Sequence, residues 1–463
     1  MVAKGELRVS ISKKEVVAAV LPLQEHWLPL SNLDLLLPPV DVGVLFCYQN
    51  TTSHGFGAMV GALKKAMAQV LVSYYALAGE VVPNSVGEPE ILCNNRGVDF
   101  IEAHADVELK HLNLYNPDDT IEGKLVPNKK KGVLAVQATQ LKCGGLVVGC
   151  TFDHRVADAY SANMFLVSWA DMAQSKPISQ IPSFRRSLLN PRRPGCVCPT
   201  LDDMYVPIST LPPPKQPLEE ATDDHLISRI YYVTIDQLNY LQSLATSDGH
   251  KRTKLEAFSA FLWKMVAQCD TTNDHKITKM GVVVDGRSRL CEGGSEEYTR
   301  LMGSYFGNVL TIPFGGERVN QVVEKPLSWV AEQVHDFLEK AVTKDHFLGL
   351  IDWVEAHRPE PALAKIYSSG SSSEDGPAFV VSSGQRFPVS KVDFGWGKPF
   401  FGSYHFPWGG DAGYVMPMPT PTGNGDWIVY MHLMKKQLEL VETHASNLFS
   451  PLTSDHLNQV PPN

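Results

Sequence analysis

Two hydrophobic periodicities alternate along this chain. Residues 57–75 carry apolar side chains three and four positions apart and predict an amphipathic helix. Residues 133–140 and 146–152 are apolar runs separated by a Cys-Gly-Gly turn and predict a β-hairpin, and residues 157–173 return to helical spacing. Further strands are predicted at residues 9–17, 81–82, 90–93, 230–233 and 280–284, and a further helix at residues 254–268. The alternation predicts α/β units in both halves of the chain.

The domain organisation follows from length and proline content. A chain of 463 residues is too long for one ordinary core, so two domains are expected. Residues 191–217 hold eight prolines, which disfavour a regular helix or a central strand. We therefore predict a first domain at residues 1–190, a proline-rich linker at 191–224 and a second domain at 225–463. A Ser/Gly/acidic stretch at residues 368–375 is expected to be a loop.

Composition narrows the class of protein. With 44% hydrophobic and 20% charged residues the chain is typical of soluble globular proteins, and its net charge of −9 disfavours nucleic acid as a partner. No apolar run reaches the length of a membrane span, and the N-terminal residues lack the apolar core of a signal peptide. The eight cysteines are then expected to be reduced thiols in a cytoplasmic protein. Cys196 and Cys198 lack a nearby Cys or His pair to complete a zinc site, so no metal is expected.

The first chemical motif is His154-Arg155-Val156-Ala157-Asp158, which follows the predicted hairpin. It places an imidazole near a carboxylate, as general-base chemistry requires. On its own, a His-x-x-x-Asp spacing is weak, because a structural histidine would give the same pattern.

The second motif, Asp393-Phe394-Gly395-Trp396-Gly397, fixes five positions and is far more specific. A protein-kinase interpretation fails, because the glycine-rich loop and the His-Arg-Asp loop of kinases are absent from the sequence. The two motifs in this order resemble the pair that marks the BAHD acyltransferases, plant enzymes that transfer an acyl group from coenzyme A to an alcohol or amine. Three further landmarks in family order support the resemblance: residues 30–34 (Leu-Ser-Asn-Leu-Asp), 76–79 (Ala-Leu-Ala-Gly) and 305–308 (Tyr-Phe-Gly-Asn).

This resemblance implies an α/β (α+β) fold of two chloramphenicol-acetyltransferase-like domains. Each domain has a mixed sheet flanked by helices, and a solvent channel runs between them. A segment of the second half crosses back to complete the first sheet, and we place it at residues 379–400. The family habit implies a monomer with no permanently bound cofactor and acyl-CoA as co-substrate.

His154 is the predicted catalytic base, since an imidazole can take a hydroxyl proton at neutral pH and the thioester can then be attacked directly. Asp158 could orient His154, as in a catalytic triad. The family pattern instead implies that Asp158 points away and pairs with an arginine of the second domain, for which Arg287 is the candidate. The resemblance likewise assigns Asp393 and Trp396 structural roles near the channel.

Coenzyme A needs cations and hydroxyls near its phosphates. Lys251, Arg252, Thr253 and Lys254 open a predicted helix and combine charge, a hydroxyl and a helix N-terminus. An ordinary solvated helix start would look the same, but the position matches the coenzyme A-contacting segment of the family.

One segment departs from the relatives. Hydroxycinnamoyl:shikimate transferases carry Thr-Ser-Trp-Thr-Arg-Leu-Pro where this chain has Ser-Ser-Gly-Gln-Arg-Phe-Pro at residues 382–388. The relatives' tryptophan is held to stabilise the oxyanion, which Gly384 cannot do. Ser382, Ser383, a backbone N–H or water would have to replace it, and the missing indole would leave room for a bulkier substrate. Arg386 aligns with an arginine that can hold the carboxylate of shikimate.

An aromatic and methionine-rich segment after the second motif is the predicted acceptor wall, suited to a flat phenylpropanoid. Its candidate residues are Tyr404, His405, Phe406, Trp408 and Met416. The whole-chain resemblance, including residues 25–29 and 401–419, favours members that esterify the side-chain hydroxyl of a monolignol such as coniferyl alcohol. The alternatives are a hydroxycinnamoyl transferase acting on shikimate, quinate or an amine, and a non-catalytic small-molecule-binding paralogue. A carrier-protein condensation domain is disfavoured, because Asp153 stands where those domains usually carry a second histidine.

Overall fold

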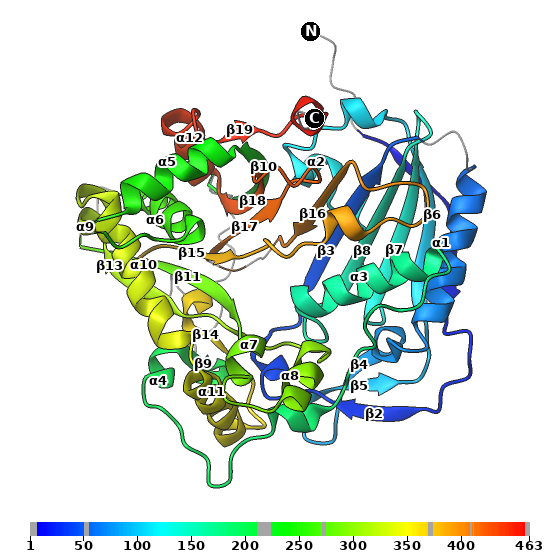
Figure 1. Ribbon diagram of the computed structural model, residues 1–463, viewed down its shortest axis with the longest axis horizontal. Coiled ribbons are helices and arrows are strands. Elements are labelled where there is room, and N and C mark those ends of the chain that lie inside the picture. Colours follow the sequence, from blue (N-terminus) through cyan, green and yellow to red (C-terminus); the bar gives the residue numbers. More distant parts are fainter. Residues whose placement is uncertain are drawn as a thin grey trace.

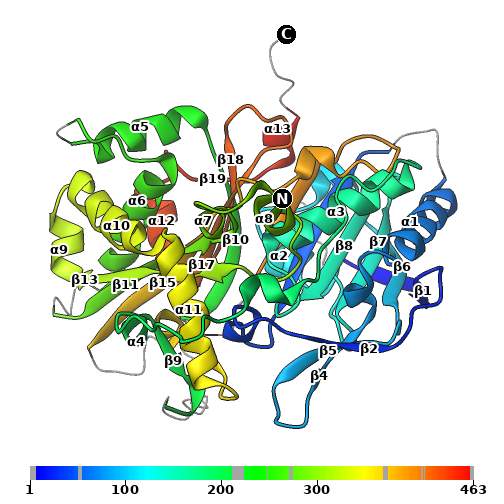
Figure 2. The same cartoon turned by 60° about the horizontal axis from the view of Figure 1, so that its bottom comes forward.

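The computed structural model describes residues 7–50, 55–210, 224–247, 249–270, 275–368, 374–407, 410 and 412–458. Two units, each built on a mixed β-sheet with helices packed against it, lie side by side (Figure 2). The predicted α/β class and the two-unit architecture are confirmed. No helix in the described part of the chain has the length and apolar character needed to cross a bilayer.

The first sheet has six strands in the described residues, in the order β1 (Val9–Val17), β6 (Val98–Ala105), β7 (Leu134–Leu141), β8 (Leu146–Asp153), β3 (Asp41–Tyr48) and β16 (Phe401–His405). Neighbouring strands are antiparallel except β6 and β7, which are parallel. The predicted hairpin is confirmed as β7 and β8. Every residue of β8 is buried, as expected for a strand covered on both faces.

Helices α1 (Phe56–Val70) and α3 (Ala159–Ala173) pack against each other and against this sheet (Figure 1). Both were predicted, with small differences at their ends. Helix α1 ends at Val70 rather than at residue 75, because the chain turns into a short 3-10 segment at Tyr75–Ala78. Helix α3 begins at Ala159 rather than at residue 157, because Asp158 is its N-cap.

The second sheet has the strand order β12 (Leu310–Thr311), β11 (Ile277–Asp285), β15 (Asp375–Ser382), β17 (Gly413–Pro419), β18 (Trp427–Met434), β10 (Leu226–Val233) and β19 (Ser450–Pro451), with β13 (Phe314–Arg318) paired to β11. Its helices are α5 (Ile235–Ala245), α6 (Lys254–Ala267), α9 (Val319–Glu324), α10 (Leu327–Ala341) and α12 (Lys435–His444). Phe258 and Trp263 of α6 are fully buried in the core of this unit. Large aromatic side chains of this kind contribute much of the apolar area that a core buries.

The remaining helices are α2 (Pro117–Thr120), α4 (Leu201–Met204), α7 (Arg287–Leu290), α8 (Glu296–Gly303), α11 (Lys344–His357) and α13 (Ser454–Leu457). The remaining strands form a three-stranded sheet of β2 (His26–Pro29), β5 (Pro89–Cys93) and β4 (Glu80–Pro83), and a two-stranded sheet of β14 (Ala362–Ala364) and β9 (Tyr205–Pro207).

The strand that crosses between the units lies just beyond the predicted segment. Residues 379–382 belong to β15, which pairs with β11 and β17 in the second sheet. Residues 383–400 make the connection, and β16 then pairs antiparallel with β3 at the edge of the first sheet (Figure 1). The chain thus crosses between the sheets within the predicted segment, and the strand that completes the first sheet follows directly after it.

The proline-rich segment packs against the second half as far as the structure describes it. The side chain of Asp352 accepts hydrogen bonds from Arg192 N (2.8 Å), Arg192 Nε (2.7 Å) and Cys196 N (2.8 Å). Strand β9 then pairs with β14. Residues 211–223 of the predicted linker and residues 369–373 of the predicted loop lie outside the described part of the chain.

Candidate active site

His154 lies in the turn that joins β8 to α3, at the boundary between the two units. Its backbone N–H donates to Val40 O (3.0 Å), and its carbonyl accepts from Asn308 Nδ2 (2.9 Å). Val40 belongs to the first unit and Asn308 to the second, so both units fix the backbone of this one residue.

A cavity of about 640 Å³ opens in front of His154. One side is formed by residues of the first unit, among them Leu37, Phe152 and Asn163. The other is formed by residues of the second unit, from the start of α6 to β15 and β17. A cavity between two units, mostly apolar with a few convergent polar groups, is the usual form of a small-molecule site.

The His154 imidazole is set up to be neutral. Burial lowers its pKa. Opposing effects come from the backbone of His154 itself, the carboxylates of Asp158 and Asp153, and Asn308. Nδ1 is shut off from solvent and has no hydrogen-bond partner among the described residues. Nε2 is thus the nitrogen available to the cavity, and a neutral imidazole with a free lone pair is the form that a general base needs.

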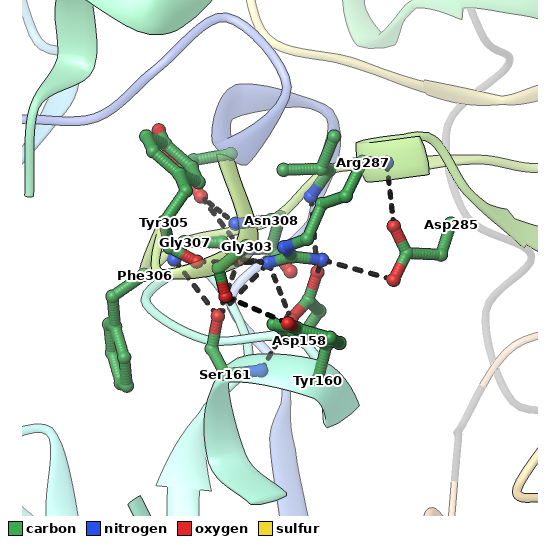
Figure 3. Close-up of polar contacts among 12 residues, drawn as sticks. Asp158, Tyr160, Ser161, Asp285, Arg287, Gly303, Tyr305, Phe306, Gly307 and Asn308 are labelled. Carbon is green, nitrogen blue, oxygen red and sulfur yellow. Dashed lines mark hydrogen bonds and ion pairs between the residues drawn. The ribbon is translucent and has the colours of Figure 1, made fainter. Parts of the chain in front are cut away.

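Asp158 does not orient the imidazole; its carboxylate is committed elsewhere (Figure 3). It forms a two-pronged ion pair with Arg287, with Nη1–Oδ2 at 2.7 Å and Nη2–Oδ1 at 3.1 Å. It also accepts from Ser161 N (2.9 Å) as the cap of α3 and from Val309 N (3.1 Å). Both partners of the pair are buried, with Asp158 1% and Arg287 5% exposed. The pair joins the start of α3 in the first unit to α7 in the second.

Arg287 makes several further contacts through its two terminal nitrogens and its guanidinium plane. Besides Asp158 it donates to Ser161 Oγ (3.1 Å), Gly307 O (2.8 Å) and Asp285 Oδ2 (3.3 Å), and its guanidinium lies 4.3 Å from the centre of the Tyr160 ring (Figure 3). Burial alone would lower the pKa of Arg287, but the charges of Asp158 and Asp285 raise it above its usual value. Arg287 is therefore a permanent structural cation, and it does not line the cavity.

Asp393 and Trp396 form a rigid turn away from the cavity. Asp393 Oδ1 accepts from Gly395 N (2.8 Å) and Gly397 N (3.0 Å), and both glycines have φ of 109°, a conformation that strains other residues. Trp396 stacks on Phe394, with ring centres 5.6 Å apart. Neither Asp393 nor Trp396 lines the cavity.

The predicted coenzyme A residues reach the cavity only in part. Of Lys251, Arg252, Thr253 and Lys254, only Thr253 lines it. Thr253 is the N-cap of α6, and its hydroxyl and N–H donate to Glu256 Oε2 at 2.6 and 2.7 Å. The Thr253 hydroxyl is thus not free for a phosphate, because a Thr-x-x-Glu capping box uses it. The assignment of this segment to coenzyme A binding stays a prediction.

Ser382, Ser383 and Gly384 all line the cavity. The expectation of extra room at Gly384 was wrong, because a Cβ there would lie 2.6 Å from Met418 Cγ and 2.7 Å from Pro417 O. Gly384 N already donates to Pro417 O (3.0 Å), so this backbone N–H is not available to an oxyanion. Ser382 is buried, whereas Ser383 is exposed.

The predicted acceptor residues divide by strand geometry. Tyr404, Phe406, Met416 and Arg386 line the cavity. His405 does not, since successive side chains of a strand point to opposite faces. Its Nε2 lies 2.6 Å from Ser403 Oγ and its Nδ1 3.3 Å from Glu122 Oε1, on the far side of β16. Trp408 lies outside the described residues.

Several polar residues of the site were not among the predicted site residues. Asn163, Asp285 and Tyr414 line the cavity, and Asn308 holds the backbone of His154. Asp285, Asn308 and Tyr414 stand in segments that had already been singled out: the one around Arg287, the Tyr-Phe-Gly-Asn landmark and residues 401–419. The described residues contain no group of three or more His, Cys, Asp and Glu side chains placed to hold a metal ion.

Comparison with known proteins settles the family. The model of the Transferase family matches residues 7–448. The chain belongs to this family. It is a BAHD acyltransferase that uses acyl-CoA, as the two motifs predicted.

The relatives of this acyltransferase are named for different substrates and products. The chain is 28% identical to the shikimate O-hydroxycinnamoyltransferase of Nicotiana tabacum, covering 94% of this chain and 99% of that protein. It is also 28% identical to the rosmarinate synthase of Plectranthus scutellarioides, covering 89% and 93% respectively. Equal identity to enzymes named for different products means that the acceptor has to be argued from the cavity.

Solved structures show the same fold. Vinorine synthase superposes with a TM-score of 0.71 at 19% identity, covering 96% of this chain and all of that one. TRI101 of F. graminearum, complexed with coenzyme A and T-2 mycotoxin, gives 0.69 at 14% identity, with 91% and 98% covered.

Proposed function

We propose that this acyltransferase esterifies the side-chain hydroxyl of a monolignol such as coniferyl alcohol, with His154 as the general base. The observation that carries the proposal is the wall of the cavity in front of His154. Tyr404, Phe406, Tyr414 and Met416 face it together, and such a wall suits a flat, neutral aromatic ring.

The charges around the cavity favour a neutral acceptor over shikimate or quinate. Among the described residues, Arg289 and Arg386 are the arginines that line it, and no lysine does. Arg386 is exposed, and Arg289 keeps 41% of its side chain exposed. Asp285 lines the same wall, and burial raises the pKa of its carboxyl against the opposing charges of Arg287 and Arg386. An acidic acceptor would thus meet the half-buried carboxyl of Asp285 without a buried cation lining the cavity to pair with.

The reaction needs no acyl-enzyme. His154 Nε2 takes the hydroxyl proton of the acceptor as its oxygen attacks the thioester carbonyl, and a tetrahedral oxyanion forms. When this intermediate collapses, the C–S bond breaks and the ester is released. The thiolate of coenzyme A then takes the proton back from the imidazolium, which restores the neutral base.

Ser382 and Tyr414 are the proposed donors to the oxyanion. Both line the cavity, and Ser382 acts as a hydrogen-bonding partner of the Tyr414 hydroxyl. Burial raises the pKa of Tyr414, so its phenol stays protonated and able to donate at neutral pH. Preorganised donors of this kind stabilise charge that develops in the transition state.

An acceptor panel tests the proposal. Purified protein is given acetyl-CoA or an aromatic acyl-CoA with coniferyl alcohol, shikimate, quinate or an aromatic amine, and release of free thiol is followed. We expect coniferyl alcohol to be acylated with the highest kcat/KM and His154→Gln to lose about 10²- to 10⁴-fold in kcat. Faster turnover of shikimate or the amine would overturn the acceptor assignment, and full activity of His154→Gln would overturn the role of the base.

A further inference from the structure

Two of the landmark motifs meet behind His154. Asp34, which ends the Leu-Ser-Asn-Leu-Asp motif, and Asn308, which ends the Tyr-Phe-Gly-Asn motif, are both fully buried. Asp34 Oδ2 accepts from Ser31 N (2.8 Å) and Ser31 Oγ (2.7 Å), which fixes the carboxylate. Asp34 Oδ1 accepts from Asn308 N (2.6 Å) and Asn308 Nδ2 (2.9 Å).

These contacts fix which way the Asn308 amide points. Nδ2 lies between two acceptors, Asp34 Oδ1 and His154 O, both at 2.9 Å. A flipped amide would place its oxygen against those two oxygens, so the orientation follows from the hydrogen-bond network. Asn308 Oδ1 therefore points away from Asp34. It is buried and has no hydrogen-bond partner among the described residues.

His154 Nδ1 is likewise buried without such a partner in the described part of the chain. Burial lowers the pKa of His154, whereas the residue's own backbone and Asn308 raise it, as acceptors beside the ring do. Catalytic hydrogen bonds are often long in a structure without substrate and tighten in the complex.

We infer that Asn308 is a positioning residue that holds His154 with its proton on Nδ1, leaving the lone pair of Nε2 to the acceptor hydroxyl. The inference rests on the proposed role of His154 as base. An amide oxygen can only accept, so an imidazole that faces it must present Nδ1–H. Asn308 thereby does for this imidazole what a buried aspartate does in a serine protease, without adding a charge.

The other charged groups near the ring do not supply this orientation. Asp158 is paired with Arg287, and Asp153 Oδ2 is paired with Arg155 Nη2 at 2.7 Å. Neither carboxylate hydrogen-bonds to the ring, although both raise its pKa through their charge. Asp34 reaches His154 only through Asn308.

The test compares Asn308→Ala and Asn308→Ser with Ser161→Ala. Ser161 Oγ bonds to Gly307 N (3.0 Å) and Gly307 O (2.9 Å), so its loss loosens the same loop without touching the acceptor beside the imidazole. We expect the Asn308 variants to lose at least about 10-fold in kcat, within the range that a positioned base contributes, with the KM for acyl-CoA nearly unchanged. The acidic limb of kcat/KM should move to lower pH, because the acceptor that stabilises the imidazolium is gone.

Ser161→Ala should lower Tm while leaving that acidic limb in place. Asn308→Ser is smaller and can still bond Asp34, so it keeps the test open if Asn308→Ala does not fold. Folded Asn308 variants with wild-type kcat and an unmoved acidic limb would overturn the inference. A loss that Ser161→Ala reproduces, with no change of pH profile in either variant, would also overturn it. His154→Gln tests the proposed role of His154 separately. If that variant keeps its turnover, His154 is not the base, and the proposed function fails rather than the inference about Asn308 alone.

Discussion

Replacing Asp158 by asparagine tests whether its carboxylate acts on structure or on chemistry. Asparagine keeps the size of the side chain and can still cap α3, because it is as good an N-cap as aspartate. It removes the negative partner of Arg287, however. Arg287 then stays buried, 5% exposed, and among the described residues Asp285 at 3.3 Å is the carboxylate left to balance its charge.

The magnitude follows from the burial of the pair. Removing one partner of a buried ion pair costs about 3–5 kcal/mol in the free energy of unfolding. Unfolding entropy is about 2.1 cal/mol/K per residue, which for 463 residues gives roughly 1 kcal/mol/K if the chain unfolds as one unit. Asp158→Asn should therefore lower Tm by about 3–5 °C and reduce the yield of folded protein.

Thermal denaturation followed by circular dichroism measures the change, and thiol release measures the turnover of the folded fraction. We expect that fraction to keep kcat within about 10-fold of wild type, since Asp158 does not bond to His154. Asp106→Asn is the control, because Asp106 forms an exposed ion pair of 3.7 Å with Lys142 whose loss should cost at most about 1 kcal/mol. A well-folded Asp158→Asn with normal Tm and no turnover would refute the structural role.

Two further predictions concern the His154 imidazole and Gly384, the glycine that replaces the relatives' tryptophan. Burial lowers the pKa of His154 from 6.5, and a base works when deprotonated, so kcat/KM should stay high below pH 6.5 and fall only through that lower value. An acidic limb above pH 6.5 in a pH–rate profile would contradict this. Gly384→Trp should lower Tm and should not raise turnover, because its Cβ would clash with Met418 and Pro417. Gly57→Trp is the control: nothing lies within 4 Å of a Cβ there, so it should change neither Tm nor turnover. Faster turnover by a stable Gly384→Trp would show that the indole can be accommodated.

Local periodicity predicted much of the fold. The hairpin before His154 and helices α1, α3 and α6 lie where apolar spacing placed them, because the apolar positions of each are buried in the core of its own unit. Local periodicity could not identify the strand that joins the first sheet after the crossing. Residues 379–382 and 401–405 are both buried strands, and nothing in either sequence says which of two sheets it joins.

Site residues could be predicted where they belong to a short sequence motif. They could not be predicted where their place depends on how distant segments pack together. His154, Asp158 and Arg287 could be named in advance, but the ion pair bridges 129 positions of sequence and its burial depends on both units. Two features of the site that were not foreseen had readable signals: the Thr-x-x-Glu box that engages Thr253, and the strand alternation that turns His405 away from the cavity. The role of Asn308 had no such signal, because it depends on Asp34, 274 positions earlier.

The late arrival of β16 has a consequence for biosynthesis. Strand β3 pairs with β8 on one side and with β16 on the other, so its second edge stays open until residues 401–405 emerge from the ribosome. Between residues 153 and 405 the ribosome adds 252 residues, which takes roughly 10 to 50 s at typical elongation rates. During that interval the nascent chain exposes one edge of β3, an apolar strand that is buried in the folded protein. The unpaired backbone groups of this edge are a template for aggregation. Chaperone demand during translation should therefore be greatest before the final tenth of the chain is made.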